Sequence, residues 1–185
     1  MDGTAKIQPT RGQSAGKEVK MNISPPQRPN AEYPGNSKNS GLSVDWVVGF
    51  ADAQGCFHIV LNKNSEMKLG WQILPEFLIV RHKRDINLLY KLRTFFGCGV
   101  VRKHSDDRYC LRIRKLDNLV NVIIPFFEKH PLKSKKNIEF KKFAYIVKLM
   151  MTNRHLTVEG FNEIVKIVKE MEKESCQDKD RVHSL

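Results

Sequence analysis

The sequence predicts an α+β fold in which helices cover one face of an antiparallel sheet. Two observations favour this class. Segments on both sides of a short polar turn at 105–107 alternate between apolar and polar residues, as the strands of a hairpin do. Apolar residues at helical spacing, such as those of 85–96, lie between the strand pairs and after them. The expected order is α-β-β-α-β-β-α followed by further helices. The sequence of the first helix and its turn, 46–57, has no second copy in the chain.

The boundaries of these elements follow from residues that start, stop or interrupt them. Ser43 can cap the first helix, and Gly97 can end the second. Pro125 interrupts the third helix, and Pro75 predicts an irregularity or a sheet edge in the second strand. Strands are expected at 56–62, 71–82, 99–104 and 108–114. Helices are expected from 44 to the turn at 52–55, and over 85–96, 116–128, 135–151 and 157–173.

Composition divides the chain into three parts. Residues 1–43 hold five of the eight prolines, with six Lys/Arg against three acids, and have too few apolar residues to form a core. We expect a disordered basic leader there, a folded domain at 44–175 and a flexible tail at 176–185. The leader matches a transit peptide poorly, because it has few arginines and no amphipathic helix. It could either contact phosphates or stay solvated.

The charge of the chain predicts its partner. A net charge of +12 and a pI near 9.6 are typical of folded domains that bind a polyanion, most often nucleic acid. An anionic membrane is the alternative, but no apolar run approaches the roughly 18 residues of a spanning helix, so no membrane partner is expected. The four cysteines include no C-x-x-C pair, which disfavours a zinc ribbon or a disulfide framework.

Basic and amide side chains gather on the two expected hairpins. On the second hairpin, arginines at 112 and 114 alternate with apolar residues, so one face is apolar and the other carries guanidinium groups. A two-stranded ribbon fits the DNA major groove, where arginine can bind guanine and neutralise phosphate. Such a face can also be merely solvated. The expected DNA contacts are Asn62, Lys63, Lys68, Gln72, Arg102, Lys103, Arg108, Arg112 and Arg114.

The segment 46–57, Trp-Val-Val-Gly-Phe-Ala-Asp-Ala-Gln-Gly-Cys-Phe, resembles the motif that names the LAGLIDADG homing endonuclease family. In that motif an apolar helix ends in a short acidic turn. The resemblance implies the family's αββαββα fold, with helices on one face of a saddle-shaped sheet and double-stranded DNA on the other. It covers about residues 43–150, and it includes the segments 74–77, 97–99, 124–127 and 132–135.

The resemblance also implies a homodimer, because one motif per chain calls for two chains whose motif helices pack together. Gly49 and Ala53 are small residues spaced four apart, which allows two helices to approach closely. Two identical saddles would bind a long, nearly palindromic DNA site. The expected interface residues are Val48, Gly49, Asp52 and Ala53.

In the family, a carboxylate at the end of the motif helix holds a divalent metal, here expected to be Mg²⁺, for phosphodiester hydrolysis. This chain has Gln54 at that position, and an amide is a poorer ligand than a carboxylate for Mg²⁺. Asp52 is the other candidate metal ligand, although support of the helix end is its alternative role. The expected catalytic residues are Gln54, Asp52, Arg81 and Lys133.

The resemblance places Arg81 and Lys133 near the scissile phosphate. Arg81 stands where close relatives often carry glutamine, so it could bind the phosphate without a metal or simply be tolerated at a strand end. Lys133 matches a basic residue of the family, and it could equally be a surface charge beside Lys135 and Lys136.

Three explanations of Gln54 stay open: natural loss of the acid in an RNA maturase or DNA binder, weak residual cleavage, or a deliberate Glu-to-Gln change. The expected function is that of an intron-encoded homing endonuclease. The resemblance implies that it cleaves DNA, and Gln54 indicates that this cleavage is reduced or lost. The alternatives are a maturase that binds group I intron RNA, and a general basic DNA-binding module. By resemblance, the gene lies in an organellar intron, so the chloroplast or the mitochondrion is the expected location.

Overall fold

A computed structural model of the chain describes residues 40–182, with side chains for residues 40–173. The leader expected at 1–43 therefore lies almost entirely outside the described residues, as do the side chains of the tail expected at 176–185. Within residues 40–182, no helix combines the length and the apolar character that crossing a membrane requires.

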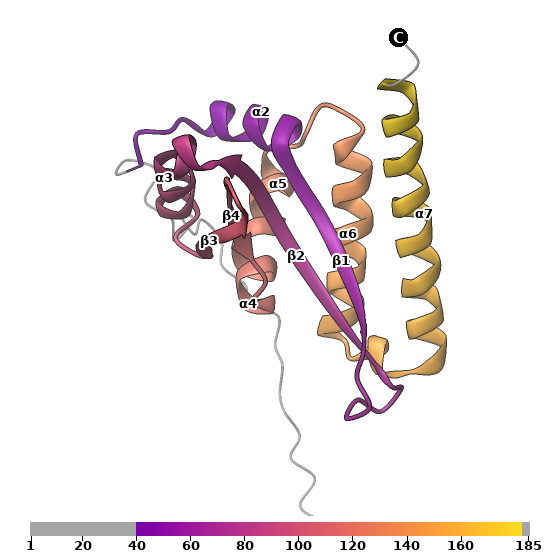
Figure 1. Cartoon of the computed structure of the whole chain (residues 1–185). Coiled ribbons are helices and arrows are strands. Elements are labelled where there is room, and N and C mark those ends of the chain that lie inside the picture. Colours follow the sequence, from indigo (N-terminus) through magenta and orange to yellow (C-terminus); the bar gives the residue numbers. More distant parts are fainter. Residues whose placement is uncertain (1–39, 183–185) are drawn as a thin grey trace, which may run out of the picture. The chain divides into compact units, whose positions relative to one another are not determined.

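A four-stranded antiparallel sheet organises the described residues (Figure 1). Its strands are β1 (Gly55–Lys63), β2 (Trp71–His82), β3 (Val100–Ser105) and β4 (Arg108–Ile113). They lie in the order β1-β2-β4-β3, so the two hairpins meet through β2 and β4. Pro75 pairs with Ile59 of β1, whereas β4 begins to pair with β2 only at Phe77. Pro75 is therefore at a sheet edge on its other side, as expected for a residue without an N–H.

Helix α2 (Val44–Gln54) begins where the sequence predicts. The N–H of Trp46 donates a hydrogen bond to Oγ of Ser43 at 3.3 Å, which satisfies one of the free donors at the helix start. Val47 and Ala51, one turn apart, are fully buried. The helix lies at the end of the β1–β2 hairpin opposite its turn (Figure 1), and β1 starts directly after it. The absence of a loop fixes Gln54 relative to the sheet.

The other helical elements confirm most of the expected boundaries. They are η1 (Lys83–Asp85), α3 (Ile86–Phe96), α4 (Leu116–Asn118), η2 (Leu119–Ile123), α5 (Ile124–Lys129), α6 (Lys136–Met151), η3 (Arg154–Leu156) and α7 (Val158–Val182). Helix α3 ends at Gly97 as predicted. Helix α7 continues beyond its expected end at 173. The irregularity expected at Pro125 is a wide π-helical turn, η2, placed before it, and the proline itself lies in the first turn of α5, where its missing N–H is tolerated.

The core lies between the helices and one face of the sheet. Along β1, β2 and β4, residues such as Phe57, Phe77 and Ile113 are buried and point toward the helices. Aromatic contacts connect the layers; for example, the rings of Phe57 and Phe127 meet edge to face at 5.5 Å. These buried residues confirm the predicted apolar face. The opposite face of the sheet, here called the free face, carries the intervening residues, including His58, Glu76 and Arg114.

Candidate nucleic-acid interface and its pocket

The free face holds most of the residues that the sequence predicts to contact DNA. The strand register sets their positions, since Asn62 is paired with Gln72 and Arg108 with His82. Arg102 is paired with Cys110 on the outer hairpin. Guanidinium and amide groups therefore follow the free face from one hairpin to the other. The six predicted contacts on this face are Asn62, Gln72, Arg102, Arg108, Arg112 and Arg114.

The predicted lysines lie elsewhere. Lys63 follows the alternation of the helix-covered face, and its ammonium nitrogen lies 5.8 Å from the centre of the Trp71 ring. Lys103 is paired with Tyr109, which packs against the core. Lys68 is exposed in the turn between β1 and β2. These three lysines are exposed at the ends of the hairpins, and their position does not test a contact with DNA.

A buried acid on the free face was not predicted. Glu76 is only 3% exposed, in the middle of β2. Its Oε2 accepts hydrogen bonds from Nε and Nη2 of Arg114, at 3.1 and 2.7 Å. Nε of Arg112 lies 3.2 Å from the same oxygen, and Nδ1 of His58 lies 3.6 Å from Oε1. The signal in the sequence was an acid within an apolar strand, because such a residue needs a buried partner.

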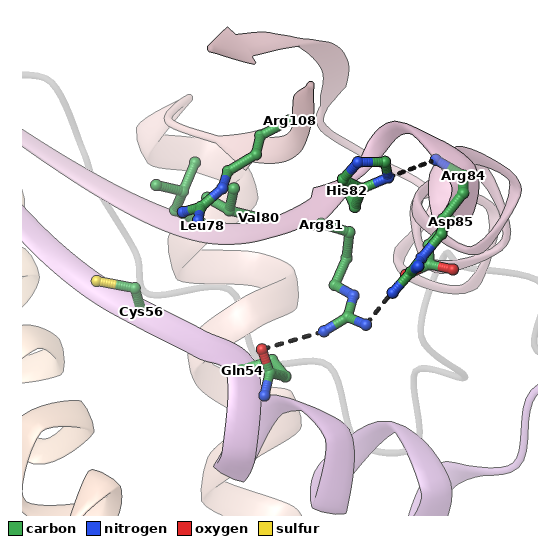
Figure 2. A pocket seen from close by; sticks show the side chains of 9 residues that line it. All are labelled: Gln54, Cys56, Leu78, Val80, Arg81, His82, Arg84, Asp85 and Arg108. Carbon is green, nitrogen blue, oxygen red and sulfur yellow. Dashed lines mark hydrogen bonds and ion pairs between the residues drawn. The ribbon is translucent and has the colours of Figure 1, made fainter. Parts of the chain in front are cut away.

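An open pocket of about 460 Å³ lies where α2 meets the end of β2 (Figure 2). Arg81 reaches across it, and its two terminal nitrogens have different partners. Nη1 donates to Oε1 of Gln54 at 3.2 Å, and Nη2 forms an ion pair with Oδ2 of Asp85 at 3.0 Å. The structure thus brings together two of the four expected catalytic residues. The lining residues are Gln54, Cys56, Leu78, Val80, Arg81, His82, Arg84, Asp85 and Arg108.

The other two expected catalytic residues meet at a different place. The carboxylate of Asp52 accepts hydrogen bonds from the backbone N–H groups of Lys133 and Ser134, at 2.9 and 3.0 Å, and from the hydroxyl of Ser134 at 2.5 Å. Partial burial alone would raise the pKa of Asp52, but these hydrogen bonds outweigh it and hold the pKa below its usual value. The Lys133 side chain is exposed and does not line the pocket.

The residues at the end of α2 fit a divalent metal poorly. Gln54 offers an uncharged amide oxygen that already accepts a hydrogen bond from Arg81. Asp52 is engaged by the loop before α6, and its two oxygens are both used. Among the described residues, no group of three His, Cys, Asp or Glu side chains is arranged to hold a metal ion. Mg²⁺ prefers carboxylates in strict octahedral geometry, and the described residues of a single chain offer no matching ligand set.

One face of α2 is apolar and exposed. Gly49 and Ala53 lie on it, and a Cβ atom at Gly49 would meet no other atom within 4 Å. Trp46, which was not predicted, is 41% exposed on this face and stacks on Phe50 at 4.8 Å. Val48, by contrast, is half-buried and packs against the core. Of the predicted interface residues, Gly49 and Ala53 thus lie on the exposed face, whereas Val48 and Asp52 are half-buried.

Both the sequence and the structure of the chain are similar to those of known proteins. The sequence model of the LAGLIDADG endonuclease family matches residues 47–147. A probable intron-encoded endonuclease of Neurospora crassa is 35% identical over 129 residues, which are 69% of this chain and 28% of that protein. An uncharacterised protein in ND4 intron 1 of Podospora anserina is 34% identical over 120 residues, 64% of this chain and 26% of that protein. The chain thus spans under a third of the length of these relatives.

Two solved structures have the same arrangement of elements. The homing endonuclease I-TnaI is 58% identical and superposes with a TM-score of 0.68, over 70% of this chain and 87% of that one. I-SmaMI, solved on an uncleaved DNA target in the presence of calcium ions, is 37% identical with a TM-score of 0.68, over 69% of this chain and 44% of that one. These likenesses bear out the predicted α+β fold with its antiparallel sheet.

Proposed function

Because the chain belongs to the LAGLIDADG endonuclease family, we propose that residues 44–175 form a homing endonuclease domain that binds long double-stranded DNA sites on the free face of its sheet. The observation that carries this proposal is the row of arginine and amide groups on that face. They stand on two antiparallel hairpins, and a two-stranded ribbon can enter the DNA major groove. The helices occupy the other face, so the two layers do not compete for the same surface.

The pairing of Glu76 with two arginines adds to this argument. A guanidinium group that is held in place can make bidentate hydrogen bonds to guanine with little loss of conformational entropy on binding. Arg112 and Arg114 are both held by Glu76 from the neighbouring strand. A face that was only solvated would not need a buried acid to fix its arginines. This arrangement supports base reading in addition to phosphate contact.

The partner of α2 in this proposal is a second copy of the chain. Trp46 is 41% exposed and lies beside the exposed small residues Gly49 and Ala53, and the open space at Gly49 leaves room for close approach of another helix. A two-fold pair of domains would place two free faces along one duplex. The site would then be long and nearly palindromic.

The family reaction is metal-dependent hydrolysis of phosphodiester bonds, and we propose that this chain binds its site with cleavage reduced or lost. Gln54 is the reason, because it removes the charge at the end of α2 while keeping the shape of glutamate. In the family reaction Mg²⁺ would activate water and stabilise the leaving oxygen. Here the ligands that would hold it are an amide and an acid already bound to a loop.

We also propose that the gene lies in an organellar intron. The Neurospora relative is named as intron-encoded, and the Podospora relative is named for an intron of ND4. The proposal predicts that DNA spanning the junction at which this intron is inserted contains the target.

The proposal is tested by selecting bound duplexes from a randomised library and then measuring cleavage of the preferred duplex with Mg²⁺. We expect a long, nearly palindromic sequence to be enriched, and slow or no cleavage by the native chain. Gln54→Glu measures what the missing acid contributes, and Asn87→Asp on the exposed side of α3 is the matched amide-to-acid control. Enrichment of no sequence would contradict DNA recognition. Rapid cleavage by the native chain would contradict the role given to Gln54.

A further inference from the structure

The pocket at the end of α2 has a fixed positive charge at its centre. The Arg81 guanidinium is held from one side by Gln54 and from the other by Asp85 (Figure 2). The Phe50 ring lies 5.7 Å from its central carbon. Three independent contacts thus fix the position of the group, while Nε of Arg81 is buried without a hydrogen-bond partner in the described part of the chain. Nη1 and Nη2 each carry a second N–H beyond those directed at Gln54 and Asp85, and these can donate to an anion in the pocket.

The remaining lining residues make the pocket cationic. Arg84 and Arg108 line it together with Arg81, against the single carboxylate of Asp85. Nδ1 of His82 accepts a hydrogen bond from the N–H of Arg84, which leaves Nε2 of the neutral ring as a donor. The pocket therefore offers N–H donors and excess positive charge. A divalent cation would be repelled by the same groups.

We infer that this pocket is an anion site, in which the Arg81 guanidinium binds a backbone phosphate of DNA without a divalent metal. The inference rests on the proposed function, since it takes DNA as the ligand of the free face. The planar fork of arginine suits two phosphate oxygens, and Arg84 and Arg108 also line the pocket, on the turn after β2 and on β4. Arg81 thus supplies a permanent cation beside Gln54.

The contact between Arg81 and Gln54 has a second consequence. A carboxylate introduced at position 54 would face the same guanidinium, because Oε1 of Gln54 already lies 3.2 Å from Nη1. It would form an ion pair with Arg81 before it could serve a metal. Residues 54 and 81 therefore act together: with an amide at 54, Asp85 is the one carboxylate that the described residues place against the guanidinium.

The first test measures binding of the full chain, in EDTA, to the duplex that it recovers most strongly from a randomised library. We expect Arg81→Gln to weaken binding about ten-fold. The slope of log K against the logarithm of the salt concentration should become shallower by about one for each pocket. Arg93→Gln, at an exposed position of α3 outside the pocket, should leave both unchanged. Adding Mg²⁺ should not replace the lost contact.

The second test locates the phosphate. Single phosphates of the duplex are replaced by neutral methylphosphonates, and one position should weaken binding of the native chain while leaving Arg81→Gln unaffected. Arg81→Lys keeps the charge without the fork, so partial retention of binding by this variant excludes misfolding as the cause, as do unchanged melting curves.

Two results would overturn the inference: equal affinity and salt dependence of Arg81→Gln and the native chain, or native binding that requires a divalent metal. Failure of the proposed function is a different outcome, in which no sequence is enriched. In that case the salt dependence is measured on random duplexes, and it still reports whether Arg81 contacts phosphate.

Discussion

Asp52 and Ser134 are 82 positions apart in the chain, yet the carboxylate of the first accepts hydrogen bonds from both the backbone N–H and the hydroxyl of the second. The contact joins the last turn of α2 to the loop that precedes α6. Asp52 thus supports the fold through hydrogen bonds that do not depend on a metal ion. An acid at this position has a structural explanation whether or not it also binds a metal.

We predict that Asp52→Ala lowers the free energy of unfolding by about 1 kcal/mol, because two backbone N–H groups and one hydroxyl lose their acceptor and remain partly hydrated. Chemical denaturation at neutral pH measures the change. Asp45→Ala is the control, since Asp45 is an exposed acid in the first turn of the same helix and should cost less. Equal losses in the two variants would argue against the loop contact.

The stability due to Asp52 should depend on pH. Its pKa is lowered in the folded chain, because the hydrogen bonds from Ser134 and Lys133 outweigh the effect of burial. A carboxyl with a lowered folded pKa contributes fully above its unfolded pKa, near 4, and loses its contribution as the pH falls below that value. The difference in unfolding free energy between the native chain and Asp52→Ala should therefore be constant above about pH 5 and shrink in more acidic solution.

Glu76→Gln should change DNA recognition in a particular direction. Removal of the buried charge frees Arg112 and Arg114 and adds one net positive charge to the free face. We expect tighter binding to random duplexes, and a slope of log K against log salt concentration that is steeper by up to about one. The ratio of affinities for the selected and random duplexes should fall. Stability should fall by about 1 to 3 kcal/mol, because buried donors lose part of their acceptor.

The control for this variant is Glu128→Gln, which removes an exposed acid paired with Lys148 at 3.3 Å, on helices that cover the other face of the sheet. It changes the net charge equally. If both variants raise affinity for random duplexes and keep discrimination intact, total charge is the cause and Glu76 has no special role in aiming the arginines.

Local patterns in the sequence predicted the elements and their faces, because both depend on neighbours within a few positions. Alternation placed Arg112 and Arg114 on the face opposite the apolar residues, and the structure agrees. The same rule would have separated Lys63 from Asn62, since consecutive strand residues point to opposite faces. Grouping basic residues by composition obscured that distinction.

The contacts that define the site could not be read from local patterns. Arg81 meets Gln54 across 27 positions, and Glu76 meets Arg114 across 38, the latter because β2 pairs with β4. The order of the strands within the sheet, β1-β2-β4-β3, was not predicted from the sequence. The alternative that Arg81 binds phosphate was stated from the sequence, but its fixation by Asp85 required the structure.

Gly99 should be intolerant of a side chain. Its φ is +94°, and a Cβ atom there would come within 2.6 Å of Cγ1 of Ile113 and 3.1 Å of the Arg112 carbonyl oxygen. We predict that Gly99→Ala destabilises the fold by about 2 to 4 kcal/mol, from backbone strain and overpacking together. Gly70→Ala separates the two causes in thermal unfolding, because Gly70 has a similar φ of +71° but open space around it. Equal losses would leave overpacking without a role.

Gly49→Glu should dissociate the proposed dimer without harming the fold. A side chain at Gly49 meets nothing within 4 Å in the chain itself, and glutamate is favoured over glycine in a helix by about 0.5 to 1 kcal/mol. Sedimentation should give twice 21.4 kDa for the native chain and 21.4 kDa for the variant, with melting of the monomer unimpaired. Asn87→Glu, on the exposed side of α3, adds the same charge and should remain dimeric. A native chain that sediments as a monomer at micromolar concentration would contradict the proposed dimer, and a dimer that tolerates Gly49→Glu would place the second copy elsewhere than on α2.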